Sequence, residues 1–206
     1  MRLFFAVNLP DEELDILENA QKQLSLFVPE NDIRWARRDQ FHFTLKFLGE
    51  QPAFRAQKAA ELAFQVGSSF EPFFITLGGF GAFPNSERPN VLWMGMEEGA
   101  DEMQMLSSSI DSGLRNLGFK LDNKPYKPHL TLARIKTYAQ ERSAAQILLR
   151  SNLSIQIRVK VSSFSLMQST LLSSGSEYTE VEKFYLANKG EINGKTKSAG
   201  YGSQQY

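Results

Sequence analysis

Apolar and polar residues alternate along much of the chain in short runs, interrupted by a few stretches with helical spacing. The alternating or continuous apolar runs predict strands over residues 3–7, 33–36, 41–48, 73–83, 91–96, 129–133, 155–167 and 181–187. Helical spacing predicts helices that begin near residue 10 and span 54–66, 103–117 with Gly118 as a C-terminal cap, and 144–149. Residues 188–206 are mostly polar, which predicts a flexible tail.

This order mixes helices with strands that follow one another closely in the sequence. Neighbouring strands joined by short turns favour antiparallel pairing, so the pattern predicts an α+β fold rather than a doubly wound parallel one. The apolar patterning stops before the tail, so residues 1–187 are expected to form a single domain and residues 188–206 a C-terminal extension. No Gly-rich phosphate-binding loop opens any of the predicted helices.

Composition narrows the possible partners. The 206 residues are 42% apolar and 12% aromatic, which is enough for a buried core, and Lys plus Arg and Asp plus Glu both total 23. A net charge of zero provides no general attraction to nucleic acid or membrane, so any RNA contact must be local. The chain has no cysteine and no apolar run near the roughly 18 residues that span a bilayer. A cytoplasmic protein without membrane contact or an obligate protein partner is therefore expected.

One tetrapeptide pattern occurs twice and contains both histidines of the chain: His42-Phe43-Thr44-Leu45 and His129-Leu130-Thr131-Leu132. Residues two apart in a strand project to the same face, so each His and Thr should point together while the apolar residues anchor the other face. Two such strands side by side would place two imidazoles and two hydroxyls around one small cavity. That arrangement suits a tetrahedral anion such as phosphate.

The chemistry available to these groups is acid–base catalysis. Imidazole titrates near pH ~6.5, so one histidine can donate a proton while the other accepts one, and threonine hydroxyls can bond non-bridging phosphate oxygens. Two histidines without a nearby carboxylate or thiolate make a poor metal cage, so no metal or cofactor is expected. The alternative is that each histidine is structural, but the duplicated pattern favours the catalytic interpretation.

The blocks around these tetrapeptides resemble the RNA 2′,3′-cyclic phosphodiesterases of the two-histidine (2H) phosphoesterases, also called the 2′-5′ RNA ligase family. The resembling segments include residues 2–7, 34–35, 42–50, 91–93, 128–134 and 166–169. The resemblance implies two pseudo-symmetric lobes of antiparallel sheet with outer helices around a central cleft that carries the two His-x-Thr strands. It also implies hydrolysis of an RNA 2′,3′-cyclic phosphate, or of a small cyclic nucleotide, to a 2′-phosphate.

The same resemblance implies residue roles: His42 as proton donor, His129 as proton acceptor, Thr44 and Thr131 holding phosphate oxygens, and Arg134 as a further phosphate contact. Arg134 lies five residues after His129, so a regular strand would point it away and a bulge must intervene if it serves the site. Lys46, four residues after His42, has the favourable parity to face the site but could equally lie solvated at the rim of the cleft. Candidates for a local basic rim are Arg34, Arg37, Arg38, Lys120, Lys124 and Lys127, which could equally be exposed surface. Candidates for base stacking are Trp35, Trp93, Phe47 and Tyr126, led by Trp35, with core packing as the alternative role for most of them.

Two other functions remain open from the sequence. The same site could join RNA ends through a 2′-5′ bond, which differs only in the hydroxyl that attacks the phosphorus. Alternatively, the chain could be a nucleotide- or RNA-binding module that keeps the cleft without turnover.

Overall fold

The strands form one antiparallel sheet in the computed structural model, which describes residues 1–26, 33–121, 123–135, 147, 155–173 and 175–187. Nine strands take part, in the order β7-β4-β5-β6-β3-β1-β8-β9, with β2 pairing to β6 off this path. Their bounds are β1 Arg2–Asn8, β2 Arg34–Trp35, β3 His42–Glu50, β4 Phe73–Phe83, β5 Val91–Glu98, β6 Leu130–Arg134, β7 Ile157–Val161, β8 Ser163–Leu172 and β9 Gly175–Tyr185.

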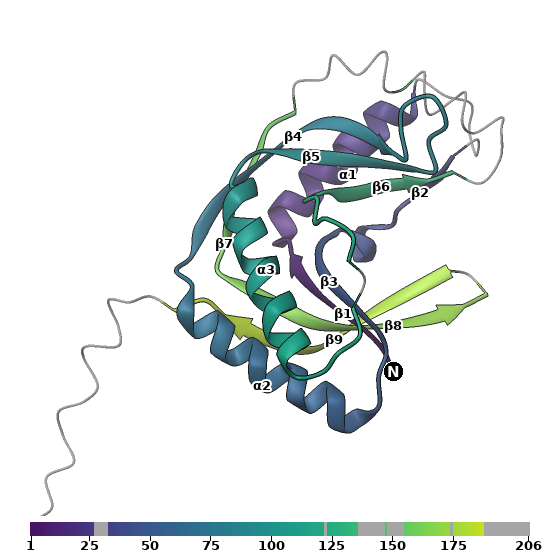
Figure 1. Ribbon diagram of the computed structural model, residues 1–206. Helices are drawn as coiled ribbons and strands as arrows, with labels where there is room; N and C mark the ends of the chain where they lie inside the picture. The colour runs from purple at the N-terminus through teal and green to yellow at the C-terminus, as the bar shows by residue number, and fades with distance from the viewer. Residues whose placement is uncertain (27–32, 122, 136–146, 148–154, 174, 188–206) are drawn as a thin grey trace, which may run out of the picture.

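Three α-helices pack against this sheet: α1 (Asp11–Ser25), α2 (Ala53–Ser69) and α3 (Ala100–Asn116). Helices α2 and α3 lie together against the half that contains β3, β1, β8 and β9, and α1 lies behind the half that contains β4, β5 and β6 (Figure 1). The Gln21 side chain on α1 donates hydrogen bonds to the backbone oxygens of Ala36 and Leu132, at 2.9 and 3.1 Å, which fixes α1 behind β6. None of the helices in the described ranges is long and apolar enough to cross a membrane.

The two halves of the sheet meet at a narrow seam. Strands β3 and β6 share a single residue pair, Phe43 opposite Leu130, whereas the pairing within each half is extensive. Both residues of this pair are fully buried in the main hydrophobic core, which is continuous from one half to the other. The predicted α+β fold with antiparallel halves and outer helices is confirmed.

Alternation along β1 separates the two faces of the half-sheet that contains β3, β1, β8 and β9, which we call the lower half-sheet. Leu3, Phe5 and Val7 belong to the main core on the helix side. Phe4 and Ala6 project to the other face, where they form a small separate cluster with Met167 of β8 and, partly buried, Tyr178 of β9. This second face, away from the helices, is the one that carries the functional side chains.

The helix boundaries follow their sequence signals closely. Helix α3 ends at Asn116, and Gly118, two residues later, has a positive φ of 76°, as the predicted C-terminal cap requires. The Gly118 N–H donates to the Arg115 carbonyl and the Phe119 N–H to that of Leu114, which satisfies the last carbonyls of the helix. The helix predicted over residues 144–149 lies outside the described residues except for Ile147, and residues 188–206 are outside them entirely, so the domain boundary at residue 187 stays a prediction.

Two strand predictions are wrong in their extent. The single strand expected over residues 155–167 is two strands, β7 and β8, which pair with β4 and β1 and so belong to different halves of the sheet. The parity of the apolar positions changes at this break, because Ile157, Val159 and Val161 are odd-numbered whereas Phe164 and Leu166 are even-numbered. The strand expected over 181–187 begins earlier, at Gly175. Its first half was missed because most of its residues are polar and none is fully buried, as suits an edge strand.

Candidate active site

The two His-x-Thr motifs lie side by side at the seam of the sheet. His42 and Thr44 flank Phe43 on β3, and His129 and Thr131 flank Leu130 at the start of β6, so the Phe43–Leu130 pair sits at the centre of a local two-fold arrangement. The four polar side chains line one cavity of about 810 Å³. Its other lining residues include Arg2, Arg34, Trp35, Gln40, Phe47, Phe83, Lys124, Arg134, Leu171, Leu172, Ser176 and Tyr178.

Packing and hydrogen bonds hold the His42 ring in place. Its Nε2 lies 3.0 Å from the Thr44 hydroxyl, and the ring also donates a hydrogen bond to the backbone of Gln40. Phe4 packs on the imidazole at 5.1 Å between ring centroids, and Tyr178 meets it edge-on, also at 5.1 Å. The hydrogen bond of Nε2 to Thr44 therefore directs that nitrogen toward the cavity.

His129 is held in a corresponding way from the other half of the sheet. Its Nδ1 lies 2.7 Å from the backbone oxygen of Lys127, two residues earlier. His42 makes the equivalent hydrogen bond to the backbone of Gln40, also two residues earlier. Phe83 packs edge-on against the imidazole at 4.8 Å, and the Lys127 ammonium lies 4.5 Å from the ring centroid of Trp93. Because Nδ1 is occupied, Nε2 is the nitrogen left for chemistry in the cavity.

Both imidazoles favour the neutral form in the free protein. Burial is the main cause that lowers the pKa of His42 from 6.5 to about 4, and the positive charges of Arg134 and His129 add to it. Burial also lowers the pKa of His129, with the charges of Lys127 and Arg134 acting in the same direction. An anion bound between the rings would oppose these charges and raise both pKa values, so phosphate binding itself promotes the protonated state that an acid needs.

The depressed pKa of His42 predicts a specific loss of stability in acid. The unfolded chain takes up this proton near pH 6.5 and the folded chain only near pH 4, so lowering the pH through this window favours unfolding by about 3 kcal/mol at this one group. Denaturant unfolding of the wild type and of His42→Gln at pH 7 and pH 4 should show this extra loss only in the wild type. Parallel pH dependences of the two free energies of unfolding would contradict it.

Each motif ends in a β-bulge at its leucine. Pairing of β1 with β3 passes from Phe5–Lys46 to Ala6–Thr44 and skips Leu45, and pairing of β5 with β6 passes from Leu92–Ala133 to Trp93–Thr131 and skips Leu132. A bulge reverses the side-chain parity beyond it. The residues five positions after each histidine, Phe47 and Arg134, therefore line the cavity.

The two bulges determine whether the cationic side chains of Arg134 and Lys46 point into the cavity. The bulge required for Arg134 to reach the site is present, and Arg134 lines the cavity. Lys46, predicted to face the site from its parity, instead points to the helix side and pairs with Asp111 of α3. The predicted basic rim is only partly assembled, because Arg34 and Lys124 line the cavity whereas Arg37 pairs with Asp39 and Arg38 pairs with carboxylates of α1.

Of the aromatic residues predicted to stack on a base, two line the cavity and two pack elsewhere. Trp35 and Phe47 line the cavity, Trp35 half-buried against the core and Phe47 exposed. Trp93 contacts the His129 ring edge-on, and the Lys127 ammonium lies over the Trp93 ring. The partly buried Tyr126 packs against the core. Trp35 therefore lines the cavity, and its role in stacking stays a prediction.

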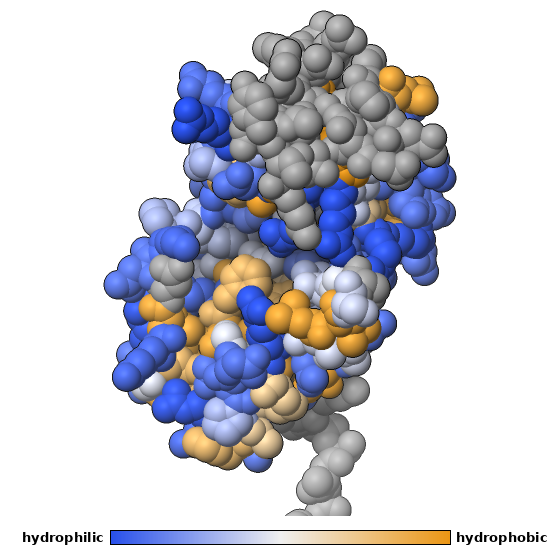
Figure 2. Space-filling view, turned by 90° about the vertical axis from the view of Figure 1, so that its right-hand side faces the viewer, coloured by the Kyte–Doolittle hydropathy of each residue, from blue (hydrophilic) through white to orange (hydrophobic). Residues whose placement is uncertain are grey.

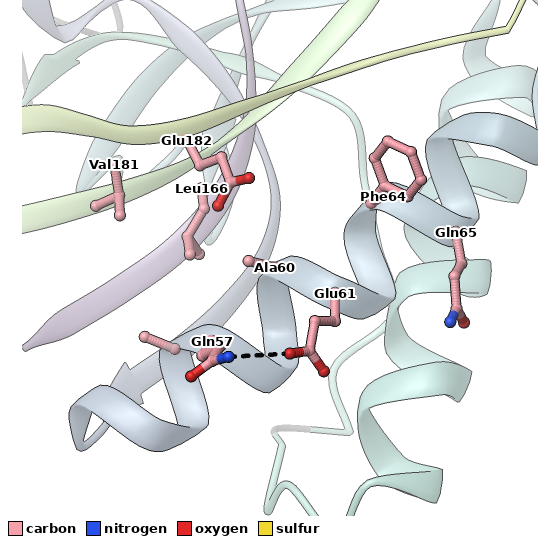
Figure 3. Close-up of a pocket in the computed structure, with 9 residues that line it drawn as sticks. Gln57, Ala60, Glu61, Phe64, Gln65, Leu166, Val181 and Glu182 are labelled. Atoms are coloured by element: carbon pink, nitrogen blue, oxygen red, sulfur yellow. Dashed lines mark hydrogen bonds between the residues drawn. The ribbon is translucent and has the colours of Figure 1, made fainter.

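A second hollow lies on the helix side of the lower half-sheet, between α2 and β9 (Figure 3). It is lined by apolar side chains such as Phe64 and Val181 and by the carboxylates of Glu61 and Glu182, and Gln57 donates a hydrogen bond to Glu61 at 3.2 Å. It contains no histidine and no cation among its described lining residues, so it is unsuited to a phosphate. The described residues contain no group of three or more His, Cys, Asp or Glu that could hold a metal ion.

Comparison with known proteins identifies the family of the chain. Residues 12–171 match the sequence pattern of the 2′-5′ RNA ligase superfamily. The chain belongs to this superfamily. Two relatives are named RNA 2′,3′-cyclic phosphodiesterase: one from Aeropyrum pernix is 37% identical over 75% of this chain and 86% of its own length, and one from Aquifex aeolicus is 32% identical over 84% and 90%.

Solved structures share the whole fold. TT0787 of Thermus thermophilus is 31% identical and superposes with a TM-score of 0.74, covering 90% of this chain and 98% of that one. LigT of E. coli, solved in complex with 3′-AMP, is 25% identical with a TM-score of 0.71 over 91% and 98%. The resemblance predicted from the sequence blocks is confirmed at the level of the family.

Sequence reasoning missed several residues that shape the site. Tyr178 contacts His42, and Phe83 contacts His129, although neither lies near a motif in the sequence. Arg2 and the β8–β9 hairpin were also not singled out as parts of the cavity. The alternation of Arg2 with Phe4 and Ala6 indicates that these three side chains share one face of β1. The sequence does not indicate that this face carries the cavity, so the alternation alone could not identify Arg2.

Proposed function

We propose that this protein hydrolyses RNA 2′,3′-cyclic phosphodiester ends to 2′-phosphomonoesters by two-histidine acid–base catalysis without a metal ion. The observation that carries the proposal is the paired imidazoles, which line one cavity and are each held by a backbone group two residues earlier, with Nε2 of His42 beside the Thr44 hydroxyl and Nδ1 of His129 bonded to Lys127. The names of the relatives in the 2′-5′ RNA ligase superfamily support the same reaction.

The proton transfers follow from the positions of the two rings. Neutral His129 accepts a proton from water through Nε2 as the water oxygen attacks phosphorus. Protonated His42 donates its Nε2 proton to the ribose 3′ oxygen as the bond between phosphorus and that oxygen breaks. The phosphate remains on the 2′ oxygen. The proton that His129 takes from water and the proton that His42 gives to the ribose oxygen balance each other.

The remaining polar groups stabilise the phosphate. Thr44 and Thr131 donate hydrogen bonds to non-bridging oxygens, where negative charge increases in the transition state. Arg134 can meet two oxygens at once through its planar guanidinium group. Trp35 contacts the terminal nucleoside.

Product analysis tests this function directly. An oligonucleotide with a 2′,3′-cyclic phosphate end should yield the 2′-phosphate, and the rate should be the same with and without EDTA because no step requires a divalent ion. Loss of activity in EDTA that returns with added metal would overturn the metal-independent mechanism. A 2′-5′ joined product would indicate ligation, and tight binding without product would indicate a binding module.

A further inference from the structure

The cavity carries more positive charge than a terminal cyclic phosphate requires. A cyclic phosphodiester has one negative charge, whereas both Arg134 and Arg2 line the cavity, together with Arg34 and Lys124, which have partners of their own, and none of the described lining residues is Asp or Glu. The chain as a whole is neutral, so this charge is concentrated at the site. Charge complementarity therefore favours a ligand with more than one phosphate, as in an RNA strand.

Arg2 lies beyond the catalytic groups on the same face of the sheet. It alternates with Phe4 and Ala6 on β1, which face away from the helices, and it pairs opposite Ser169 of β8. Ala6 lies opposite Thr44, so Arg2 is four residues, or about 13 Å along the strand, from the level of Thr44. The long Arg2 side chain lines the same cavity as Thr44 and can extend part of the way along this distance, so it suits a phosphate next to the one at Thr44 rather than the same one.

Apolar side chains lie between and beside these polar groups. Phe47 is 60% exposed, and its ring packs at 5.7 Å on that of Phe4, which is two residues from Arg2 along β1. Leu171 of β8 is 67% exposed and follows Ser169, the partner of Arg2, by two residues. On the face shown in Figure 2, hydrophobic side chains gather below the band of hydrophilic ones at the waist of the molecule. Such a surface is suited to the face of a nucleobase.

The hairpin that carries Leu171 is fixed across the cavity. Near its turn, the backbone oxygen of Ser176 accepts a hydrogen bond of 2.8 Å from the Gln40 side chain, in the 3₁₀ helix η1 (Arg38–Gln40). The Arg37 guanidinium lies 3.5 Å from the same oxygen. The hairpin therefore spans from the lower half-sheet to η1, which places the apolar surface beside the catalytic groups.

We propose that Arg2, Phe47 and Leu171 form a subsite for the nucleotide that precedes the terminal, cyclic-phosphate-bearing nucleotide of a single-stranded RNA. Arg2 contacts the phosphodiester that joins these two nucleotides, and Phe47 and Leu171 contact the base of the preceding one. The substrate is accordingly the end of an RNA strand in preference to a free cyclic mononucleotide. The inference rests on the proposed hydrolysis, since the subsite is defined relative to its reacting phosphate.

Three substrates test the subsite: a 2′,3′-cyclic mononucleotide, a dinucleotide with the same cyclic end, and that dinucleotide with an uncharged methylphosphonate linkage. For the wild type, kcat/KM should be about tenfold or more higher on the charged dinucleotide than on the mononucleotide. Arg2→Gln should remove about tenfold on the charged dinucleotide and less than about twofold on the methylphosphonate one. Phe47→Ala should lower the ratio of dinucleotide to mononucleotide kcat/KM with either linkage.

Lys58→Gln is the matched control, because it removes one positive charge from the exposed side of helix α2, on the opposite face of the same half-sheet. Its substrate ratios should equal those of the wild type. Equal kcat/KM of the wild type on mononucleotide and dinucleotide, or equal losses of Arg2→Gln on both dinucleotides, would overturn the subsite. Failure of the wild type to hydrolyse any of the three would instead overturn the proposed function.

Discussion

Replacement of either histidine by alanine is expected to lower kcat for cyclic phosphate hydrolysis by about 10²–10⁴-fold. The reason is that each imidazole performs one of two required proton transfers, and no Asp, Glu or third His lines the described part of the cavity. Steady-state kinetics on a cyclic-phosphate-ended oligonucleotide provides the measurement. A variant that keeps wild-type kcat would exclude that histidine as an acid or base.

Combining the two substitutions sharpens the result. Groups that act as one unit give strongly non-additive losses, so the His42→Ala, His129→Ala double variant should be little slower than the worse single variant. His42→Gln, which keeps a polar side chain between Phe4 and Tyr178, distinguishes lost chemistry from lost packing. Its unfolding midpoint near pH 7 should lie close to that of the wild type while its kcat stays low.

Removal of Arg134 is the second substitution with a large expected effect. Arg134→Gln should lower kcat/KM by about 10–10²-fold, because a charged hydrogen-bond donor to the phosphate is lost. Its charge also lowers the pKa of both His42 and His129. The pH profile of kcat/KM should therefore move to higher pH in this variant, as both imidazoles become easier to protonate.

Arg134→Lys separates the two contributions. Lysine keeps the positive charge, so the pH profile should stay near that of the wild type, but it lacks the planar fork and should recover only part of kcat/KM. Lys58→Gln on α2 is again the control for a general loss of charge. An Arg134→Gln profile that shows the wild-type pH optimum would contradict electrostatic coupling between Arg134 and the histidines.

The sequence predicted most of this site because its chemistry is concentrated in a repeated local pattern. His42 and His129 are the only histidines, and strand parity places each beside its threonine. Irregularities of the strands were harder to predict. Lys46 was expected in the cavity from regular alternation, but the bulge at Leu45 turns it toward Asp111.

The remaining differences between prediction and structure come from pairing between strands that are distant in the sequence. Residues 155–167 look like one strand because both parts are apolar and extended, although the chain passes from one half-sheet to the other at Ser162. Tyr178 and Arg2 come to the site only through pairing of β1, β8 and β9. Contacts between residues so distant in sequence leave no local signature, so the structure was needed to find them.

The two leucine bulges make each motif compatible with a chain that is one residue shorter. If Leu45 were absent, Thr44 and Phe47 would stand two positions apart on a regular strand and would still share the cavity face, with the pairing to β1 unchanged on both sides. Absence of Leu132 would likewise keep Thr131 and Arg134 on one face. A chain shortened by one residue at either bulge would therefore change the buried core without rearranging the groups that line the cavity.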